Sequence, residues 1–237
     1  MNLGLTCIVP AHNEGLSIYE TLLELDESFK SLMPFTIFVS EDGSRDNTRD
    51  EVLRASMKTS SSRILLSQPS DRLGYSKAVQ RGILECQTEF ICFIDADGQY
   101  DPKDIQKLLN QFTSTTSVIV GYRNPRADNY NRIIYSRLFG VLYRLLGGPK
   151  LKDPSSPMLI ARTKDIKKIA SINFHLTFGF WWEFQWRIHS LGIDVLEIPI
   201  THRNRSAGKT QVYSLRKIPS IVYTHVIGLL KLKEELS

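Results

Sequence analysis

Two carboxylates separated by one small residue, Asp95 and Asp97, directly follow a run of apolar residues at positions 90–94. Apolar and β-branched residues in such a run predict a buried strand. In an open α/β sheet, ligands collect just beyond the carboxyl ends of the strands. Two oxygen donors at that place suit a divalent cation that carries phosphate. Asp101 and Pro102 come next and predict the start of a helix, with Asp101 as its N-cap.

Further polar residues follow other predicted strands. Pro10 ends the first strand because it has no N–H to donate, and Glu14 opens the next helix. Asp42 follows the second strand, where it would lie beside Glu14 and could accept a hydrogen bond from a base or a ribose. Gly74 permits close backbone approach at another helix start, and Lys77 is placed to meet a phosphate. The structural alternatives are a dipole-favoured carboxylate at Glu14, an ordinary turn at Asp42 and a solvated lysine at Lys77.

The elements that position these residues alternate regularly in the first half of the chain. We expect strands at 5–9, 35–39, 63–66, 90–94 and 117–121, and helices at 15–32, 46–57, 75–85 and 102–112. This alternation implies an α/β fold with a largely parallel sheet and helices on both faces. In the second half we expect helices at 130–146, 179–190 and 214–236, and strands at 158–161 and 194–198. No linker that would separate two domains is evident.

Composition sets limits on the class of protein. The chain has 237 residues, 42% of them hydrophobic, which supports a sizeable core. The net charge of +5 favours an anionic partner, and phosphates, nucleic acid and anionic lipid all satisfy it. Cys7 and Cys92 lie in predicted strands, which indicates reduced core cysteines in a cytosolic chain. We expect neither a signal peptide nor a membrane-spanning run of about 20 apolar residues.

Taken together, the motifs resemble the inverting family-2 glycosyltransferases, which have the GT-A fold. The matching segments agree in order and spacing over the first half of the chain and lie at 10–14, 41–48, 72–78 and 95–102. A closer resemblance is to the branch that charges polyprenyl phosphates, typified by dolichyl-phosphate mannose synthase. It rests on 120–123, on Arg137, on 153–156 and on 205–210. This chain departs from the usual pattern at Pro157 and at Thr210-Gln211.

The resemblance implies roles for individual residues. Pro10, Glu14 and Asp42 would hold the base and ribose of a nucleotide sugar, with Gly74 and Lys77 at the same rim. Asp95 and Asp97 would hold Mg²⁺ or Mn²⁺ against the diphosphate, with Gln99 as a further ligand. Four basic residues would meet the anionic acceptor or the leaving diphosphate: Arg123, Arg137, Arg205 and Lys209.

The reaction implied by this resemblance is an in-line displacement at the anomeric carbon of the sugar, with inversion. A phosphate acceptor is already ionised at neutral pH and needs no strong general base. A hydroxyl acceptor would need a carboxylate to take its proton, and Asp153 and Glu183 are the candidates. For Glu183, a structural role on the face of a helix is an equally good alternative to the role of general base. Trp181, Trp182 and Trp186 fit a core or a groove wall better than a platform for sugar stacking.

We therefore expect a metal-dependent transferase that moves a sugar from GDP-mannose or a UDP-hexose to a polyprenyl or dolichyl phosphate. The rival predictions are transfer to a saccharide hydroxyl and a non-catalytic protein that binds nucleotide sugars. Nucleic-acid binding is not expected, because the basic residues are dispersed and lack a recognition motif. We expect one GT-A domain, with a nucleotide-sugar half at 1–125, an acceptor half at 126–213 and a C-terminal helix at 214–237.

The C-terminal helix is the second indication of the acceptor. Its apolar residues recur at helical spacing, and basic residues flank this stripe: Ile218, Ile221, Val222, Val226, Leu229 and Leu230, flanked by Arg216, Lys217, Lys231 and Lys233. Such an amphipathic helix fits a membrane surface or a lipid groove. Packing on the domain, or a contact in a homodimer, is the alternative. We expect peripheral association with the cytosolic face of a membrane, or with a membrane subunit.

Overall fold

Seven strands form a single mixed sheet in a computed structural model that describes residues 2–30, 34–60, 63–69, 71–128, 130–204 and 218–236. The strands are β1 (Asn2–Ala11), β2 (Phe35–Glu41), β3 (Arg63–Ser67), β4 (Thr88–Phe93), β5 (Val118–Arg123), β6 (Leu159–Arg162) and β7 (Val195–Ile200). Their order across the sheet is β3-β2-β1-β4-β6-β5-β7. Strand β6 runs antiparallel to β4 and β5, and all other neighbouring pairs are parallel.

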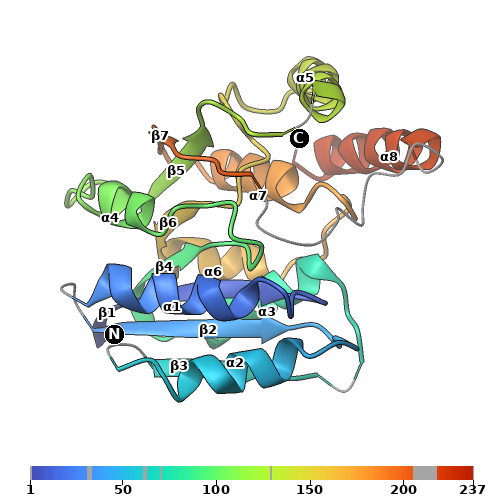
Figure 1. Cartoon of the computed structure of the whole chain (residues 1–237). Helices are drawn as coiled ribbons and strands as arrows, with labels where there is room; N and C mark the ends of the chain where they lie inside the picture. The colour runs from blue at the N-terminus through green and yellow to red at the C-terminus, as the bar shows by residue number, and fades with distance from the viewer. Residues whose placement is uncertain are drawn as a thin grey trace.

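Helices cover both faces of this sheet (Figure 1). They are α1 (Ile18–Phe29), α2 (Thr48–Ser56), α3 (Tyr75–Glu85), α4 (Lys103–Leu109), α5 (Tyr130–Leu145), α6 (Thr163–Ala170), α7 (Phe180–Ser190) and α8 (Ile218–Leu236). One core cluster joins α1, α2 and α4 to the sheet, and a second joins α3, α6 and α7 to the opposite face. A third cluster packs α5, α7 and α8 together, away from β3.

The observed fold confirms the predicted α/β class with a mainly parallel mixed sheet. The helix predicted at 75–85 matches α3 at both ends, and the helices predicted at 46–57, 102–112, 130–146 and 179–190 are a few residues shorter in the structure. Helix α6 was not predicted, because its eight residues supply only a short apolar pattern. Helix α4 is assigned from Lys103, and the predicted capping by Asp101 is confirmed, because Asp101 Oδ1 accepts the backbone N–H of Lys103 at 3.0 Å and Pro102 already has helical backbone angles. Residues 214–217 of the predicted last helix lie outside the described residues.

Strand direction gathers several chain segments at one edge of the sheet. Because β1, β2, β4, β5 and β7 run the same way, their carboxyl ends all meet there. The adjacency of β1 and β4 creates the crevice in which open α/β sheets bind ligands. All three cysteines are free and buried, which confirms the predicted burial of Cys7 and Cys92 and adds Cys86. Among the described residues, none of the helices has the length and apolar character needed to cross a bilayer.

Candidate active site

A polar cavity of about 340 Å³ opens at the carboxyl edge of the sheet. It receives residues that follow β1, β2, β4, β5 and β7, together with the first turns of α3 and α7. Its lining includes most of the residues predicted from the sequence: Pro10, Glu14, Asp42, Asp95, Asp97, Gln99 and Arg123. These residues are far apart in the chain and meet because their strands are neighbours in one direction.

Asp95 and Asp97 face this cavity from the end of β4. The Oδ1 atom of Asp97 accepts the backbone N–H of Gln99 at 3.1 Å, which fixes the turn that carries both carboxylates. Burial and the negative charge of Asp97 raise the pKa of Asp95 to about 7. Two carboxylates are thus held close together in a site where a positive charge would stabilise both.

This donor set fits a divalent cation that binds together with a phosphate ligand. Within the described residues, no group of three or more His, Cys, Asp or Glu side chains is arranged to enclose a metal ion. Two carboxylates and the amide oxygen of Gln99 do line the cavity. Mg²⁺ is commonly held by one or two carboxylates and completes its shell with phosphate oxygens and water. The site is therefore suited to a cation that arrives with its phosphate ligand.

Asp42 has a more local role than the sequence suggested. Its buried carboxylate accepts the backbone N–H groups of Leu73 and Gly74, with the Leu73 nitrogen 2.7 Å from Oδ1. Gly74 has a φ of 93°, a backbone conformation that favours glycine, and it begins α3. The Asp42 carboxylate thereby holds the loop before α3 at the rim of the cavity that Pro10 and Glu14 line.

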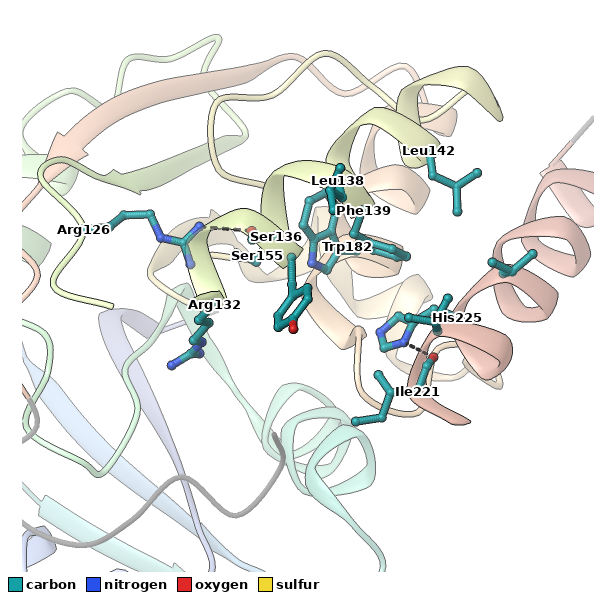
Figure 2. Close-up of a pocket in the computed structure, with 13 residues that line it drawn as sticks. Arg126, Arg132, Ser136, Leu138, Phe139, Leu142, Ser155, Trp182, Ile221 and His225 are labelled. Atoms are coloured by element: carbon teal, nitrogen blue, oxygen red, sulfur yellow. Dashed lines mark hydrogen bonds between the residues drawn. The ribbon is translucent and has the colours of Figure 1, made fainter. Parts of the chain in front are cut away.

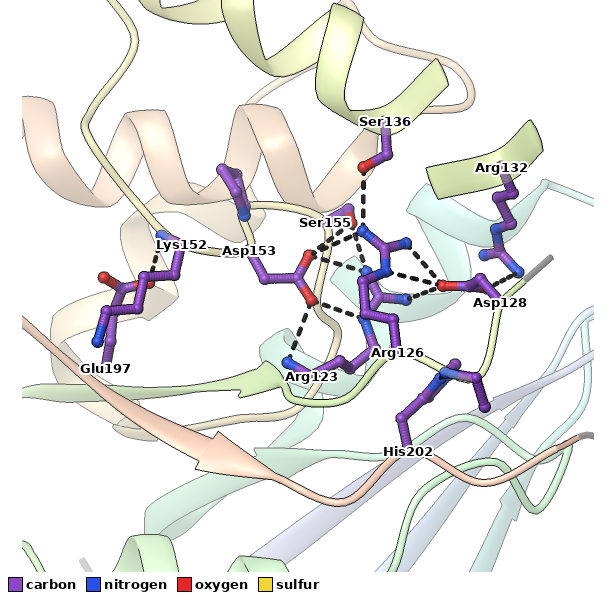
Figure 3. A network of polar contacts seen from close by, with 12 residues as sticks. Arg123, Arg126, Asp128, Arg132, Ser136, Lys152, Asp153, Ser155, Glu197 and His202 are labelled. Atoms are coloured by element: carbon purple, nitrogen blue, oxygen red, sulfur yellow. Dashed lines mark hydrogen bonds and ion pairs between the residues drawn. The ribbon is translucent and has the colours of Figure 1, made fainter. Parts of the chain in front are cut away.

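Arg123, Asp153 and their neighbours form a buried ionic network beside the cavity (Figure 3). Arg123 donates to both carboxylate oxygens of Asp153, from Nε at 2.6 Å and from Nη2 at 2.8 Å. Burial alone would raise the pKa of Asp153, but the hydrogen bonds and charge of Arg123 outweigh it and hold the pKa at about 2. Asp128 accepts from Arg126 and Arg132 at 2.7 and 2.8 Å. Three guanidinium groups and two carboxylates leave an excess of positive charge next to the cavity.

His202 adds a hydrogen-bond donor to the cavity wall. The backbone N–H of Ala127 donates to His202 Nδ1 at 3.0 Å, so this nitrogen carries a lone pair. Burial and the charge of Arg123 lower the pKa of His202 to about 4, so the ring is neutral at pH 7 and its proton is on Nε2. The sequence analysis assigned His202 no role, because the contact with Ala127 joins positions 75 residues apart.

A second, apolar cavity of about 300 Å³ lies between α5, α7 and α8 (Figure 2). Apolar side chains from these helices dominate its lining: Leu138, Phe139, Leu142, Trp182, Ile221, Val222 and Val226. Arg126 and Arg132 lie at one end of it. Arg132, Ser155 and Trp182 line both cavities, so the polar and apolar cavities adjoin. Arg132 had no predicted role, although the sequence places it on the helix predicted at 130–146.

Two of the predicted basic residues, Lys77 and Arg137, lie outside the polar cavity. Lys77 donates from Nζ to the Asn173 side chain at 3.2 Å and does not line the polar cavity. Arg137 is exposed on α5 and lines neither cavity. Arg205 and Lys209 fall outside the described residues. The structure thus brings the predicted Arg123 to the polar cavity, together with Arg72 and Arg132, which had no predicted role.

Neither carboxylate considered as a general base faces the polar cavity. Asp153 is held by Arg123, as described above. Glu183 is fully buried in α7, where its Oε2 accepts the backbone N–H groups of His175 and Leu176 and its Oε1 pairs with Arg187 at 2.7 Å. This arrangement supports the structural alternative for Glu183. The three tryptophans are also buried, and Trp181 and Trp182 form part of the cavity wall.

Comparison with known proteins agrees with this geometry. The family model described as "Glycosyl transferase family 2" matches residues 6–170, well over half of the chain. The chain belongs to glycosyl transferase family 2. The matched segment of this glycosyltransferase contains the carboxylate pair and the Arg123–Asp153 network.

Curated relatives of this glycosyltransferase carry names that specify lipid phosphates. It is 25% identical to an undecaprenyl-phosphate 4-deoxy-4-formamido-L-arabinose transferase of Edwardsiella ictaluri over 94% of this chain and 66% of the relative. It is 24% identical to a dolichol-phosphate mannosyltransferase of Pyrococcus furiosus over 86% of this chain and 58% of the relative. A dolichyl-phosphate beta-glucosyltransferase of Trichomonas vaginalis is 32% identical over 60% of this chain and 45% of the relative. The chain therefore spans less than two thirds of the length of these relatives.

Solved structures confirm the GT-A fold of this glycosyltransferase. Glucosyl-3-phosphoglycerate synthase from Mycobacterium tuberculosis, in complex with Mn²⁺, UDP-glucose and phosphoglyceric acid, superposes with a TM-score of 0.72. The alignment covers 98% of this chain and 80% of that protein at 18% identity. The same protein in complex with UDP alone gives a TM-score of 0.70.

Proposed function

We propose that this glycosyltransferase transfers a sugar from a nucleotide-sugar donor to a polyprenyl phosphate, with Mg²⁺ or Mn²⁺ as cofactor. The observation that carries the proposal is the junction of two cavities of opposite character. The polar cavity is lined by the carboxylate pair and by guanidinium groups, whereas most of the lining of the apolar cavity is aliphatic and aromatic side chains. A lipid phosphate needs both environments side by side, because its headgroup is charged and its tail is hydrocarbon.

The donor would occupy the polar cavity. Pro10 and Glu14 would lie against its nucleoside, with Asp42 acting through the loop that it holds. Asp95, Asp97 and Gln99 would hold a divalent cation, whose chemistry is to neutralise negative charge on the departing diphosphate. The curated relatives with lipid-phosphate names and the structural neighbour with UDP-glucose and Mn²⁺ support this assignment.

The acceptor phosphate would lie at the junction, beside Arg132 and Ser155. One of its oxygens would attack the anomeric carbon while the bond from that carbon to the diphosphate oxygen breaks, and its electron pair leaves with the diphosphate. Arg123, Arg132 and the Nε2–H of His202 are preorganised to stabilise the anionic oxygens. A phosphate nucleophile needs no proton acceptor, which agrees with the ion-paired state of Asp153 and Glu183.

Because the proposed acceptor is a membrane lipid, the protein would have to contact a membrane to reach it. Apolar residues remain exposed on the two helices that flank the apolar cavity, Leu138, Val141 and Leu145 on α5 and Val222, Ile227 and Leu230 on α8. We propose that these helices meet the membrane surface that contains the polyprenyl phosphate, or a membrane subunit. Three free, buried cysteines favour the reducing cytosolic side.

The proposal is tested by incubating the protein with radiolabelled GDP-mannose and UDP-hexoses, Mn²⁺ or Mg²⁺, and a short polyprenyl phosphate. We expect label in the lipid phase with one donor, lost with EDTA and in the Asp97→Asn variant. Transfer to a saccharide hydroxyl but not to the lipid phosphate would replace the proposal with the rival transferase. Tight binding of a nucleotide sugar without any turnover would instead indicate a binding protein.

A further inference from the structure

A chain of two hydrogen bonds ends on the first carboxylate of the pair. The indole Nε1–H of Trp181 donates to the hydroxyl oxygen of Tyr75 at 2.8 Å. The Tyr75 hydroxyl donates to Asp95 Oδ1 at 2.9 Å. Trp181 lies in the first turn of α7, Tyr75 is the first residue of α3, and Asp95 follows β4. All three residues line the polar cavity, although Trp181 and Tyr75 are 106 positions apart in the sequence.

The chemistry of the three groups fixes which atom donates and which accepts in each of these two hydrogen bonds. An indole N–H can only donate, so the Tyr75 oxygen must accept from Trp181. The single hydroxyl proton of Tyr75 is then directed at Asp95, whose carboxylate accepts in its ionised form. Trp181 thus orients the Tyr75 hydroxyl, and that hydroxyl in turn orients the carboxylate.

Aromatic packing keeps the donors in place. The Trp181 ring packs edge-on against Phe93 with a centroid distance of 5.1 Å, and Phe93 is the last residue of β4. Tyr75 packs edge-on against Phe180 at 6.2 Å. Trp181 is only 6% exposed. The indole is therefore fixed to the same strand end that carries Asp95, which makes the geometry of the carboxylate depend on α3, β4 and α7 together.

We propose that Tyr75 and Trp181 are positioning residues that orient Asp95 for the cation and diphosphate of the donor. The inference deepens the proposed function and depends on it for the identity of the ligand. One oxygen of Asp95 is occupied by Tyr75, and the described residues give Oδ2 no hydrogen-bond donor. That oxygen remains available to a ligand in the cavity. Tyr75 and Trp181 act through Asp95 and need not take part in the chemical step.

The test compares Tyr75→Phe, Trp181→Phe and the double variant with the parent protein. Isothermal calorimetry measures the binding of Mn²⁺ and GDP or UDP to each folded protein, in the absence of turnover. Tyr143→Phe is the control, because the Tyr143 hydroxyl also donates a hydrogen bond, to the backbone oxygen of Trp182 at 3.0 Å, but Tyr143 lines neither cavity.

We expect Tyr75→Phe to weaken Mn²⁺-dependent nucleotide binding about tenfold, the effect of one lost hydrogen bond to a charged group. Trp181→Phe should weaken it less, and the double variant should be no weaker than Tyr75→Phe alone, because Trp181 acts through Tyr75. In transfer assays, the KM for the donor should rise while the KM for the acceptor stays constant. Tyr143→Phe should bind as the parent does.

Unchanged Mn²⁺ and nucleotide affinity in folded Tyr75→Phe would overturn the inference. Strictly additive losses in the double variant would also overturn it, since they would show that Trp181 acts independently of Tyr75. These outcomes differ from failure of the proposed function, in which the parent protein itself would bind neither Mn²⁺ nor nucleotide. Because Tyr75→Phe removes a single atom, it tests the inference even if the Trp181 variant does not fold.

Discussion

At the scale of single residues, burial and partners decide what a carboxylate can do. Asp153 and Asp95 lie in the same region, yet Asp153 is neutralised by Arg123, whereas Asp95 lies beside another carboxylate. The pKa values of these two groups shift in opposite directions for that reason. An ion-paired Asp153 stabilises the arginine network, and an unneutralised Asp95 favours binding of a cation.

Asp153→Asn should destabilise the protein strongly, because it leaves the buried Arg123 guanidinium without its main partner. The expected loss is about 3–5 kcal/mol of unfolding free energy, measured by urea denaturation at pH 7. Asp194→Asn, in an exposed loop, is the control and should change stability little. A variant that keeps its stability but loses activity, together with the low-pH limb of the pH–rate profile, would indicate a general base at Asp153 instead.

The lowered pKa of His202 predicts a pH-dependent stability. The folded protein favours the neutral ring, so its stabilisation is complete above the unfolded pKa of about 6.5 and is lost as pH falls toward 4. Between pH 7.5 and 5.0 the parent should therefore lose about 2 kcal/mol more stability than His202→Gln. Urea denaturation of both proteins at the two pH values measures the difference. Equal losses would show that His202 titrates normally in the folded protein.

At the scale of secondary-structure elements, α8 is joined to α7 and to the segment before α7. Arg187 of α7 pairs with Glu235 of α8 at 2.8 Å and with Glu183 at 2.7 Å. Glu235 also lies 2.7 Å from His175. Gly228 lets the α8 backbone approach Leu176 closely. The sequence prediction of an amphipathic last helix is thus refined, since one side of it packs on the domain and the other stays exposed.

Gly228→Ala should push α8 away from His175 and Leu176, in the segment before α7. The added Cβ would lie 2.6 Å from Leu176 Cδ2 and 2.9 Å from the His175 carbonyl oxygen. Overpacking of this kind costs about 1–3 kcal/mol, which exceeds the gain of about 1 kcal/mol in helix propensity. Gly140→Ala on α5 is the matched control, with Trp182 Cη2 at 3.5 Å as its nearest contact, and should be neutral or stabilising. Thermal denaturation measures both, and equal midpoints would contradict the close packing.

At the scale of the whole molecule, two adjoining cavities are formed by two different groups of elements. The polar cavity belongs to the carboxyl edge of the sheet, and the apolar cavity belongs to the cluster of α5, α7 and α8. Trp182 of α7 and Arg132 of α5 contribute to both. Under the proposed function, the hydrocarbon tail of the acceptor binds in the apolar cavity, so only changes in that cavity should have effects that depend on the length of the tail.

A charge placed in the apolar cavity should therefore weaken use of long acceptors selectively. Leu138→Asp, on α5, should raise the KM for a polyprenyl phosphate about tenfold or more. A bound tail would cover the exposed Leu138 side chain, and burial of a leucine contributes about 1.5–3 kcal/mol. The KM for a phosphate with a single isoprene unit should change much less. Met57→Asp is the control, since Met57 is exposed just after α2 and lines neither cavity. Equal effects on the KM of long and short acceptors would show that the tail does not bind in this cavity.

Local pattern was enough to predict much of the fold. Apolar runs and helix-start residues along the chain indicated most strands and helices, and α3 was predicted at both ends. The rule that parallel strands end at one edge then predicts that Glu14, Asp95 and Asp97 lie at the same edge of the sheet. The antiparallel insertion of β6 between β4 and β5 and the short helix α6 were not predictable in this way. Pairing direction and short helices depend on packing against the rest of the chain.

The sequence by itself determined the fold class, the carboxylate pair and the resemblance that implies sugar transfer. Only the tertiary structure decided that Arg123 holds Asp153, that Trp181 reaches Asp95 through Tyr75, and that Lys77 lies outside the cavity. The physical reason is the range of the interactions. Strand and helix patterns arise between residues a few positions apart, whereas these partners are brought together by strand order and core packing across tens of residues.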